Sequence, residues 1–142
     1  MPLEERAIES VDHGVSILIV DDDETFQKAI RRFLSDDPTL KIVGVAYDGL
    51  EAQDKVQELK PDLVLMDALM PVMGGVEATR LITARFPGTI VIGLSSVDTH
   101  AMREAMLNAG AVELFGKIDV VKELIPAIQG YIAARNLRES KS

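Results

Sequence analysis

The sequence has no cysteine and no tryptophan, and only 4% of its residues are aromatic. Without cysteine there can be no disulfide framework and no thiolate metal site, so cysteine usage does not indicate a compartment. No apolar run approaches the length of a membrane-spanning segment. Residues 1–16 are acidic and lack the apolar stretch of a signal peptide. A cytoplasmic protein that does not enter the membrane is therefore expected.

Positive charge is also scarce, because 15 Lys and Arg face 23 Asp and Glu, which gives a formal net charge of −8. This balance disfavours direct binding of nucleic acid or anionic lipid, and it favours a cation or a basic partner. The 142 residues, 47% of them hydrophobic, are enough for one compact core. We expect one domain at residues 15–136, an N-terminal arm at residues 1–14 and a C-terminal tail or linker at residues 137–142.

The sequence does contain a regular alternation of strand and helix patterns. Short β-branched and leucine-rich runs predict buried strands at residues 15–20, 42–46, 63–66, 89–94 and 112–115. Helical spacing predicts helices from residue 24 to the break at residues 36–38, at about residues 50–59, 75–86 and 99–108, and at the end to about residue 136. Asp23 is the expected N-cap of the first helix. Pro126 should either bend the last helix or delay its start.

Five strand–helix units of this length imply a parallel sheet with helices on both faces. Right-handed crossover connections leave few topologies open. We therefore predict a flavodoxin-like, doubly wound α/β fold with a five-stranded sheet of order 2-1-3-4-5.

Polar residues gather where the predicted strands end. Asp21 and Asp22 follow the first strand, Asp67 the third, Ser95 the fourth and Lys117 the fifth. In such sheets, ligands bind outside the carboxyl ends of the strands, so these groups should meet. Three converging carboxylates repel one another unless a cation holds them, and an all-oxygen ligand set suits Mg²⁺. A hydroxyl and an ammonium could bind phosphoryl oxygens, which makes Asp67 the natural nucleophile for an acyl phosphate.

These residues resemble the response regulator receiver family of two-component signalling. The resemblance covers about residues 15–132, nearly the whole chain. It is carried by Ile19-Val20-Asp21-Asp22, by residues 61–67 ending in Asp67, by Met70-Pro71, by Ser95, and by Gly110-Ala111 leading to Lys117.

The resemblance implies a phosphoacceptor switch rather than an enzyme with a separate substrate. Asp67 would take a phosphoryl group from a phosphohistidine on a histidine kinase or phosphotransfer protein. Asp21, Asp22 and Asp67, together with the backbone carbonyl of Leu69, would hold Mg²⁺. The side chains of Ser95 and Lys117 would bind the phosphoryl oxygens. The domain would assist its own phosphorylation and dephosphorylation.

The resemblance also implies a switch on the face of strands four and five, controlling an output domain or an effector protein. A homodimer through the helix at residues 99–108, the fifth strand and the last helix is one candidate arrangement. The aromatic residue that such domains usually move is Leu114 here. The neighbouring Phe115 should point to the opposite face of the sheet, because side chains alternate along a strand.

Three other functions fit parts of the pattern. A haloacid-dehalogenase-like phosphatase needs a second aspartate where this chain has Leu69. A flavodoxin-type FMN carrier needs a hydroxyl- and glycine-rich phosphate loop where this chain has residues 21–23, all aspartate. A receiver-fold scaffold would bind proteins without being phosphorylated. No helix-turn-helix follows the domain within these residues, so output is expected through another protein or through a domain outside them.

Overall fold

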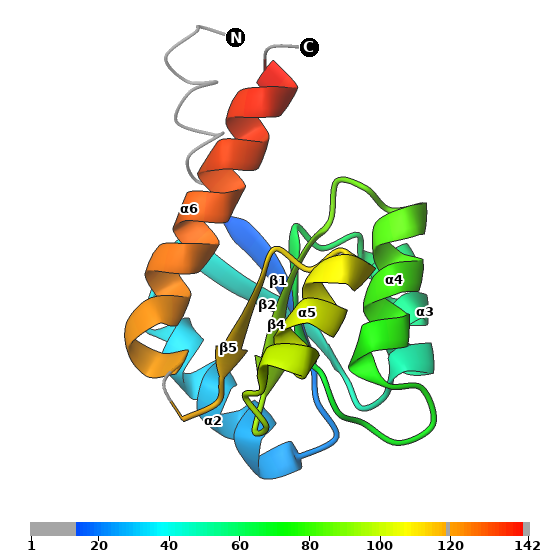
Figure 1. The fold of residues 1–142 in the computed structure, drawn as a ribbon. Coiled ribbons are helices and arrows are strands. Elements are labelled where there is room, and N and C mark those ends of the chain that lie inside the picture. Colours follow the sequence, from blue (N-terminus) through cyan, green and yellow to red (C-terminus); the bar gives the residue numbers. More distant parts are fainter. Residues whose placement is uncertain (1–13, 119, 141–142) are drawn as a thin grey trace, which may run out of the picture.

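Five parallel strands form the centre of the fold in the computed structural model, which describes residues 14–118 and 120–140. They are β1 (Val15–Val20), β2 (Leu40–Ala46), β3 (Leu63–Asp67), β4 (Ile90–Ser95) and β5 (Glu113–Gly116). Their order in the sheet is β2-β1-β3-β4-β5, and all neighbouring pairs are parallel. The predicted flavodoxin-like topology is confirmed (Figure 1).

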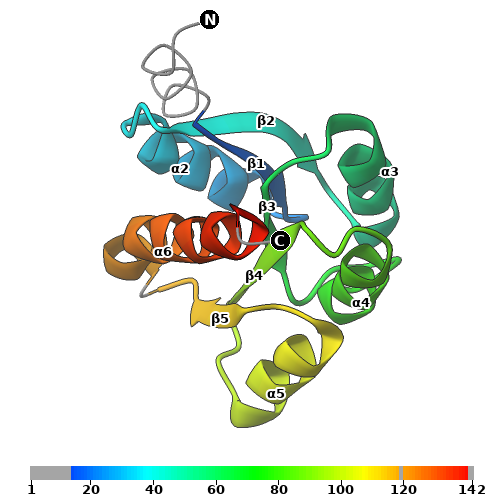
Figure 2. The same ribbon diagram turned by 90° about the horizontal axis from the view of Figure 1, so that it is seen from above.

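Helices cover both faces of this sheet. They are α2 (Glu24–Ser35), α3 (Gly49–Leu59), α4 (Gly75–Arg85), α5 (His100–Ala109) and α6 (Val120–Ser140). Seen from above, α2 and α6 lie on one side of the sheet, and α3, α4 and α5 lie on the other (Figure 2). Among the described residues, no helix is long and apolar enough to cross a membrane.

The predicted elements are all present, with small differences at their ends. Asp23 caps α2 as predicted, because its side chain accepts hydrogen bonds from the N–H groups of Thr25 and Phe26. Helix α6 starts at Val120 and contains Pro126, so the proline does not delay the helix. The helix also runs to Ser140, past the predicted end near residue 136. Residues 1–13 and 141–142 lie outside the described residues, so the predicted arm, tail and domain bounds remain predictions.

The core lies in two apolar layers, one on each side of the sheet. Ile17 and Ile19 face α2 and α6, whereas Leu18 and Val20 face α3 and α4. All four side chains are buried, as predicted for a central parallel strand. The alternation confirms that Leu114 and Phe115 point to opposite faces, because they belong to different layers.

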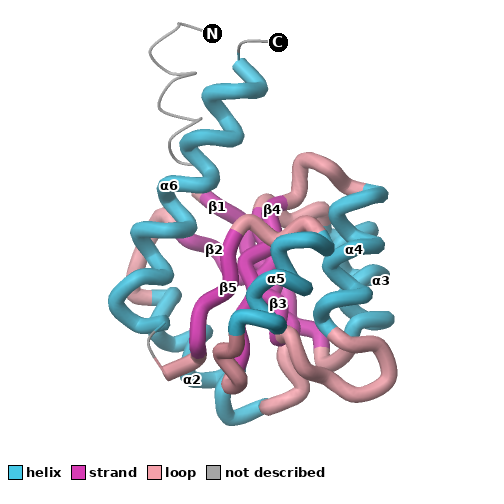
Figure 3. Tube along the Cα trace, viewed as in Figure 1, coloured by secondary structure: helices cyan, strands magenta, loops and turns pink. Residues whose placement is uncertain are grey.

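The strand register brings the predicted polar residues to one edge of the sheet. Val20 pairs with Met66, so the next residues, Asp21 and Asp67, lie side by side. The register continues from Asp67 to Leu94 on β4 and from Ser95 to Gly116 on β5. The loops that carry the site all leave from this edge, at the lower side of the view in Figure 3.

Candidate functional site

Three aspartates form an acidic cluster at the carboxyl ends of β1 and β3. Asp21, Asp22 and Asp67 each offer a carboxylate oxygen, and these oxygens lie within 4.8 Å of one another. Asp21 and Asp67 are buried, with 1% and 4% of their surfaces exposed, whereas Asp22 is exposed. The structure thus brings together the three carboxylates that the sequence predicted to converge.

The backbone around Asp21 is fixed by a side chain that the sequence analysis did not identify. Gln27 is 2% exposed, and its Nε2 donates hydrogen bonds of 2.7 Å to the carbonyl of Asp21 and 2.8 Å to that of Ala46. The N–H of Asp21 donates to the same Ala46 carbonyl at 3.0 Å. Gln27 therefore ties the ends of β1 and β2 together beneath the cluster. Its position three residues before Ile30, on the apolar stripe of α2, was the available signal.

Lys117 supplies positive charge to the cluster. Its Nζ lies 2.7 Å from Asp21 Oδ2 and 3.6 Å from Asp67 Oδ2, and its side chain is 14% exposed. Asp21 Oδ1 accepts a hydrogen bond from the N–H of Asp23 at 2.8 Å. Asp21 Oδ2 is buried and accepts no well-directed hydrogen bond, although it forms the ion pair with Lys117. An under-satisfied buried oxygen among carboxylates, without His or Cys, fits a hard divalent cation such as Mg²⁺.

The environment of Asp67 opposes its ionisation. Burial, followed by repulsion from the Asp21 carboxylate, raises the pKa of Asp67 to about 7. The nearby Lys117 ammonium and the N–H of Leu69, which donates to Asp67 Oδ1 at 3.3 Å, act in the opposite direction. A further positive charge at the cluster would favour the ionised, nucleophilic carboxylate.

Helix α4 begins directly against the backbone of Asp67. A Cβ atom on Gly75 would lie 2.0 Å from the Asp67 carbonyl oxygen and 2.8 Å from Ala68 Cα, so only glycine fits there without rearrangement. The Gly75 N–H donates to the Ala68 carbonyl at 3.2 Å. Beyond Ala68, the side chain of Leu69 is exposed at the rim. The predicted role of the Leu69 carbonyl as a metal ligand remains a prediction.

Ser95 is buried at the end of β4 and is engaged within its own loop. Its Oγ donates to the carbonyl of Val97 at 2.8 Å and accepts from the N–H of Val97 at 3.0 Å. The N–H of Lys117 donates to the Ser95 carbonyl at 2.9 Å, which places the two strand ends together. The hydroxyl therefore has to leave the Val97 carbonyl before it can donate to another oxygen.

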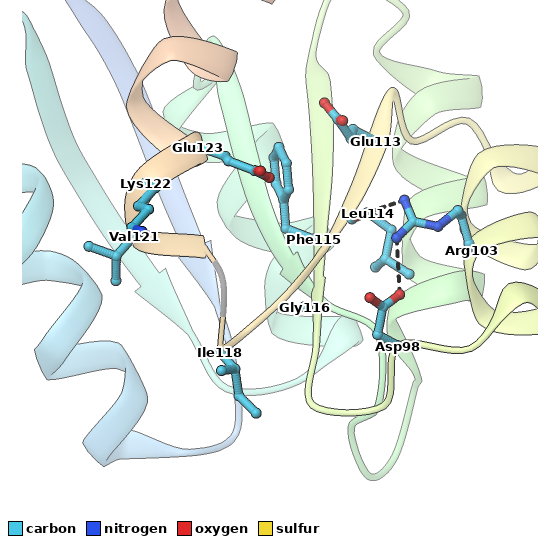
Figure 4. Close-up of a pocket in the computed structure, with 10 residues that line it drawn as sticks. All are labelled: Asp98, Arg103, Glu113, Leu114, Phe115, Gly116, Ile118, Val121, Lys122 and Glu123. Carbon is cyan, nitrogen blue, oxygen red and sulfur yellow. Dashed lines mark hydrogen bonds and ion pairs between the residues drawn. The ribbon is translucent and has the colours of Figure 1, made fainter.

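A hollow of about 420 Å³ lies beside the edge strand β5 (Figure 4). Arg103 of α5 crosses one side of it, donating to the carbonyl of Leu114 at 2.8 Å and to Asp98 Oδ1 at 3.0 Å. Leu114 is buried and packs inward, because a Cβ on Gly93 would meet its Cδ1 at 2.8 Å. Figure 4 shows Phe115 on the side of α6, away from Leu114. Arg103 and Asp98 were not identified from the sequence.

Comparison with known proteins adds independent information. A family model described as response regulator receiver domain matches residues 17–129. Over 106 residues the chain is 42% identical to a protein-glutamate methylesterase/protein-glutamine glutaminase of Pseudomonas putida, covering 73% of this chain and 28% of that protein. It is 36% identical over 115 residues to response regulator GacA of Pseudomonas viridiflava, covering 81% and 54%.

A solved structure shows the same fold. The crystal structure of a LuxR-family two-component response regulator from Aurantimonas superimposes with a TM-score of 0.81 at 30% identity, covering 86% of this chain and 87% of that one. The curated relatives are longer, since the chain spans 28% of the methylesterase and 54% of GacA. What those longer proteins do is therefore not carried over to this chain as a whole.

Proposed function

This chain belongs to the response regulator receiver family, and from that premise we propose that it is a phosphoacceptor switch whose Asp67 receives a phosphoryl group. The observation that carries the proposal is the cluster of Asp21, Asp22 and Asp67, with carboxylate oxygens within 4.8 Å of one another and Lys117 Nζ beside them. A scaffold that only binds proteins has no need for three converging carboxylates that repel one another.

The proposed reaction is a simple displacement at phosphorus. An ionised oxygen of Asp67 attacks the phosphorus, and the bond between phosphorus and the imidazole nitrogen of a partner's phosphohistidine breaks. The nitrogen leaves with the bonding electrons, and the ring departs as neutral imidazole because its other nitrogen carries a proton. The transfer changes no oxidation state, so it needs no oxidant or reductant. Because the pKa of Asp67 is raised to about 7, a large fraction of the molecules carry a protonated Asp67 near neutral pH until a cation binds the cluster.

Asp21, Asp22 and Asp67 would hold Mg²⁺, with the Leu69 carbonyl as the further protein ligand expected from the family. When bound, the ion would neutralise carboxylate charge and stabilise negative charge on the phosphoryl oxygens. The ammonium of Lys117, already 2.7 Å from Asp21 Oδ2, supplies a second positive charge for those oxygens. The ligand chemistry of the cluster supports this assignment, because every side-chain donor in it is a carboxylate.

We propose that the signal reaches the face of β4 and β5 through the Ser95 loop. To donate to a phosphoryl oxygen, the Ser95 hydroxyl must break its 2.8 Å bond to the Val97 carbonyl. Movement of this loop would pull on Asp98, whose carboxylate is bonded to Arg103, and Arg103 in turn holds the Leu114 carbonyl. We propose this route in place of the movement of an aromatic residue that is usual in the family. The corresponding residue in this chain is Leu114, which is buried.

The proposed partners are a histidine kinase or phosphotransfer protein upstream and an output domain or effector protein downstream. The face formed by α5, β5 and α6 is the proposed contact, including for a homodimer. The acidic composition supports the absence of direct nucleic-acid binding by this domain. A cytoplasmic location remains a prediction from the sequence.

Incubation with acetyl phosphate tests the proposal. Wild-type protein should gain one phosphoryl adduct by intact mass in excess Mg²⁺, and none when the metal is chelated. Asp67→Asn should remain folded and unmodified, because the amide is a poor nucleophile of nearly the same shape. An unmodified wild-type protein that still binds a partner would support the scaffold alternative. An equal adduct on Asp67→Asn would place the phosphoryl group elsewhere.

A further inference from the structure

The ammonium group of Lys117 has an aromatic neighbour as well as its two carboxylates. Lys117 Nζ lies 4.3 Å from the centre of the Phe26 ring, within the range of a cation–π interaction. The Lys117 side chain is 14% exposed, so the ring covers a side of the ammonium that water would otherwise occupy. An aromatic ring attracts a cation through its face but has no lone pair with which to bind a metal ion.

The backbone that carries the Phe26 ring is held by the same short segment that carries the acidic cluster. Asp23 Oδ1 accepts a hydrogen bond of 3.3 Å from the N–H of Phe26, and the N–H of Asp23 donates to Asp21 Oδ1 at 2.8 Å. Phe26 also packs against the core layer under α2 and α6. Asp21, Asp23, Phe26 and Lys117 are therefore linked by consecutive contacts, and the last of these joins Lys117 Nζ to Asp21 Oδ2 at 2.7 Å.

In the proposed function, Lys117 and the metal ion compete for the same carboxylate, that of Asp21. Asp21 Oδ2 is the nearest partner of the Lys117 ammonium, and Asp21 is also one of the three proposed metal ligands. A carboxylate that binds a divalent cation has less negative charge to offer a neighbouring ammonium, and the two cations repel each other. Lys117 then needs a hold that does not compete for the metal. Without such an interaction, the flexible side chain of Lys117 would allow the ammonium group to move into solvent.

We propose that Phe26 is a positioning residue that holds the Lys117 ammonium beside Asp67 when Asp21 binds the cation. The proposal rests on the proposed function, because the ammonium is needed there to bind a phosphoryl oxygen. Phe26 itself touches neither the metal nor the phosphoryl group. Its effect on phosphorylation is exerted through the location of Lys117.

Phe26→Leu removes the aromatic face and keeps an apolar side chain, while Phe26→Tyr keeps the face. Phe33→Leu is the matched control, because Phe33 is a partly buried residue of the same helix packed against the same core layer. Both leucine variants should lose stability. Only Phe26→Leu should slow phosphorylation by acetyl phosphate at saturating Mg²⁺, by roughly two- to thirtyfold if the lost cation–π interaction acts in full on the reaction. Phe26→Tyr should stay close to the wild-type rate.

A second measurement does not depend on phosphorylation. In NMR spectra, the ε-methylene protons of Lys117 should be displaced by the ring current of Phe26, both without metal and with Mg²⁺. Phe26→Leu should abolish this displacement, whereas Phe33→Leu and Phe26→Tyr should retain it. If the Lys117 signals move to their solvent-exposed position when Mg²⁺ is added to the wild type, the ring does not hold the ammonium in the relevant state.

The outcomes separate this inference from the proposed function. If Phe26→Leu matches Phe33→Leu in phosphorylation rate and in Lys117 shifts, the ring is only core packing and the inference is wrong. If wild-type protein is never phosphorylated at Asp67, the proposed function fails. The inference then fails with it as a statement about phosphorylation, while the NMR data still report whether the ring holds Lys117.

Discussion

Two aspartates at opposite ends of β3 show how differently one fold can treat the same side chain. Asp62 immediately precedes the strand, and Asp67 is its last residue. Burial tends to raise the pKa of Asp62, but hydrogen bonds from Ser16 and Arg135, together with the Arg135 charge, lower it below its usual value. The pKa of Asp67 is instead raised to about 7. The two pKa values differ because the groups that surround the two carboxylates differ.

Both carboxylate oxygens of Asp62 accept well-directed hydrogen bonds. Its Oδ2 accepts from the backbone N–H of Ser16 at 2.9 Å and from the Ser16 hydroxyl at 3.1 Å. Its Oδ1 accepts from Arg135 Nη2 at 2.9 Å, and Arg135 Nη1 donates to the Gly88 carbonyl at 3.1 Å. Asp67 accepts one hydrogen bond of 3.3 Å from the N–H of Leu69, lies 3.6 Å from Lys117 Nζ and faces another buried carboxylate. We infer that Asp62 serves stability, and the disfavoured charge of Asp67 is consistent with its proposed role as phosphoacceptor.

The largest expected effect is an opposite response of stability to the same substitution at the two positions. Asp62→Asn breaks charged hydrogen bonds and should lower the free energy of unfolding by about 1.5–3 kcal/mol. Asp67→Asn removes a disfavoured charge and should raise it at neutral pH in the absence of metal. Urea unfolding of both variants with EDTA present measures the two effects. Equal losses of stability would mean that the two ends of β3 do not differ as described.

Those two positions also indicate what the sequence could and could not predict. The site groups Asp21, Asp67 and Ser95 follow strands, and parallel topology alone brings strand ends to one edge. The role of Arg135 was not predicted from the sequence. Its pairing with Asp62 joins residues 73 positions apart, and it depends on where α6 crosses the sheet.

The contacts that were missed share a physical reason. Gln27, Phe26 and Arg103 lie on helices, where residue spacing indicates which face is buried but not which atoms the side chain will reach. Their partners are backbone carbonyls or a lysine on other elements. Such contacts depend on where each helix lies along the sheet, and that position is determined by the packing of the whole core. The sequence therefore indicated the reacting groups more completely than the residues that position them.

The second difference between the two ends of β3 should appear in the pH dependence of stability. The folded-state pKa of Asp67, about 7, lies above its ordinary value of 3.8, so the folded protein retains a proton that the unfolded chain releases. Stability contributed by this group is present below pH 3.8 and is lost as the pH rises to about 7. Asp62 acts in the opposite sense, because its lowered pKa stabilises the fold above 3.8 and that stability is lost on acidification.

Melting temperatures of wild type and Asp67→Asn between pH 4 and pH 8, with EDTA present, isolate the Asp67 contribution. The advantage of Asp67→Asn over wild type should grow through this interval and level off above pH 7, because the pKa of Asp67 is raised to about 7. A constant difference would show that Asp67 ionises normally in the folded protein.

A smaller effect is expected from Mg²⁺. An ion that binds only the folded state at ten times its dissociation constant stabilises the fold by about 1.4 kcal/mol. Asp22→Asn should weaken this response by removing a proposed ligand on the exposed side of the cluster. Asp62→Asn should retain it, although that variant starts from a lower stability. A melting temperature that does not change with Mg²⁺ at low ionic strength would contradict the metal assignment.

The smallest expected effect concerns what covers each aspartate. The Arg135 guanidinium donates a hydrogen bond to Asp62, whereas the loops that follow Asp67 and Ser95 carry the exposed side chains of Leu69 and Val97, at the proposed rim of the site. These two residues lie two positions beyond Asp67 and Ser95, and in the receiver family the equivalent positions vary and modulate the hydrolysis of the acyl phosphate. Hydrolysis needs a water in line with the phosphorus, opposite the aspartyl oxygen.

Apolar groups at this rim can crowd that water but cannot orient it by a hydrogen bond. We therefore predict a comparatively long-lived phosphorylated state. Leu69→Asn should hydrolyse faster, by roughly a few-fold, because its amide can hold the water. Its fold and Mg²⁺ affinity should change little, since the Leu69 side chain is 47% exposed and only its backbone is a proposed ligand. First-order loss of phosphate from purified protein in excess Mg²⁺ measures the effect. Equal decay rates for the two proteins would show that the side chain at this position does not govern access of water to the acyl phosphate.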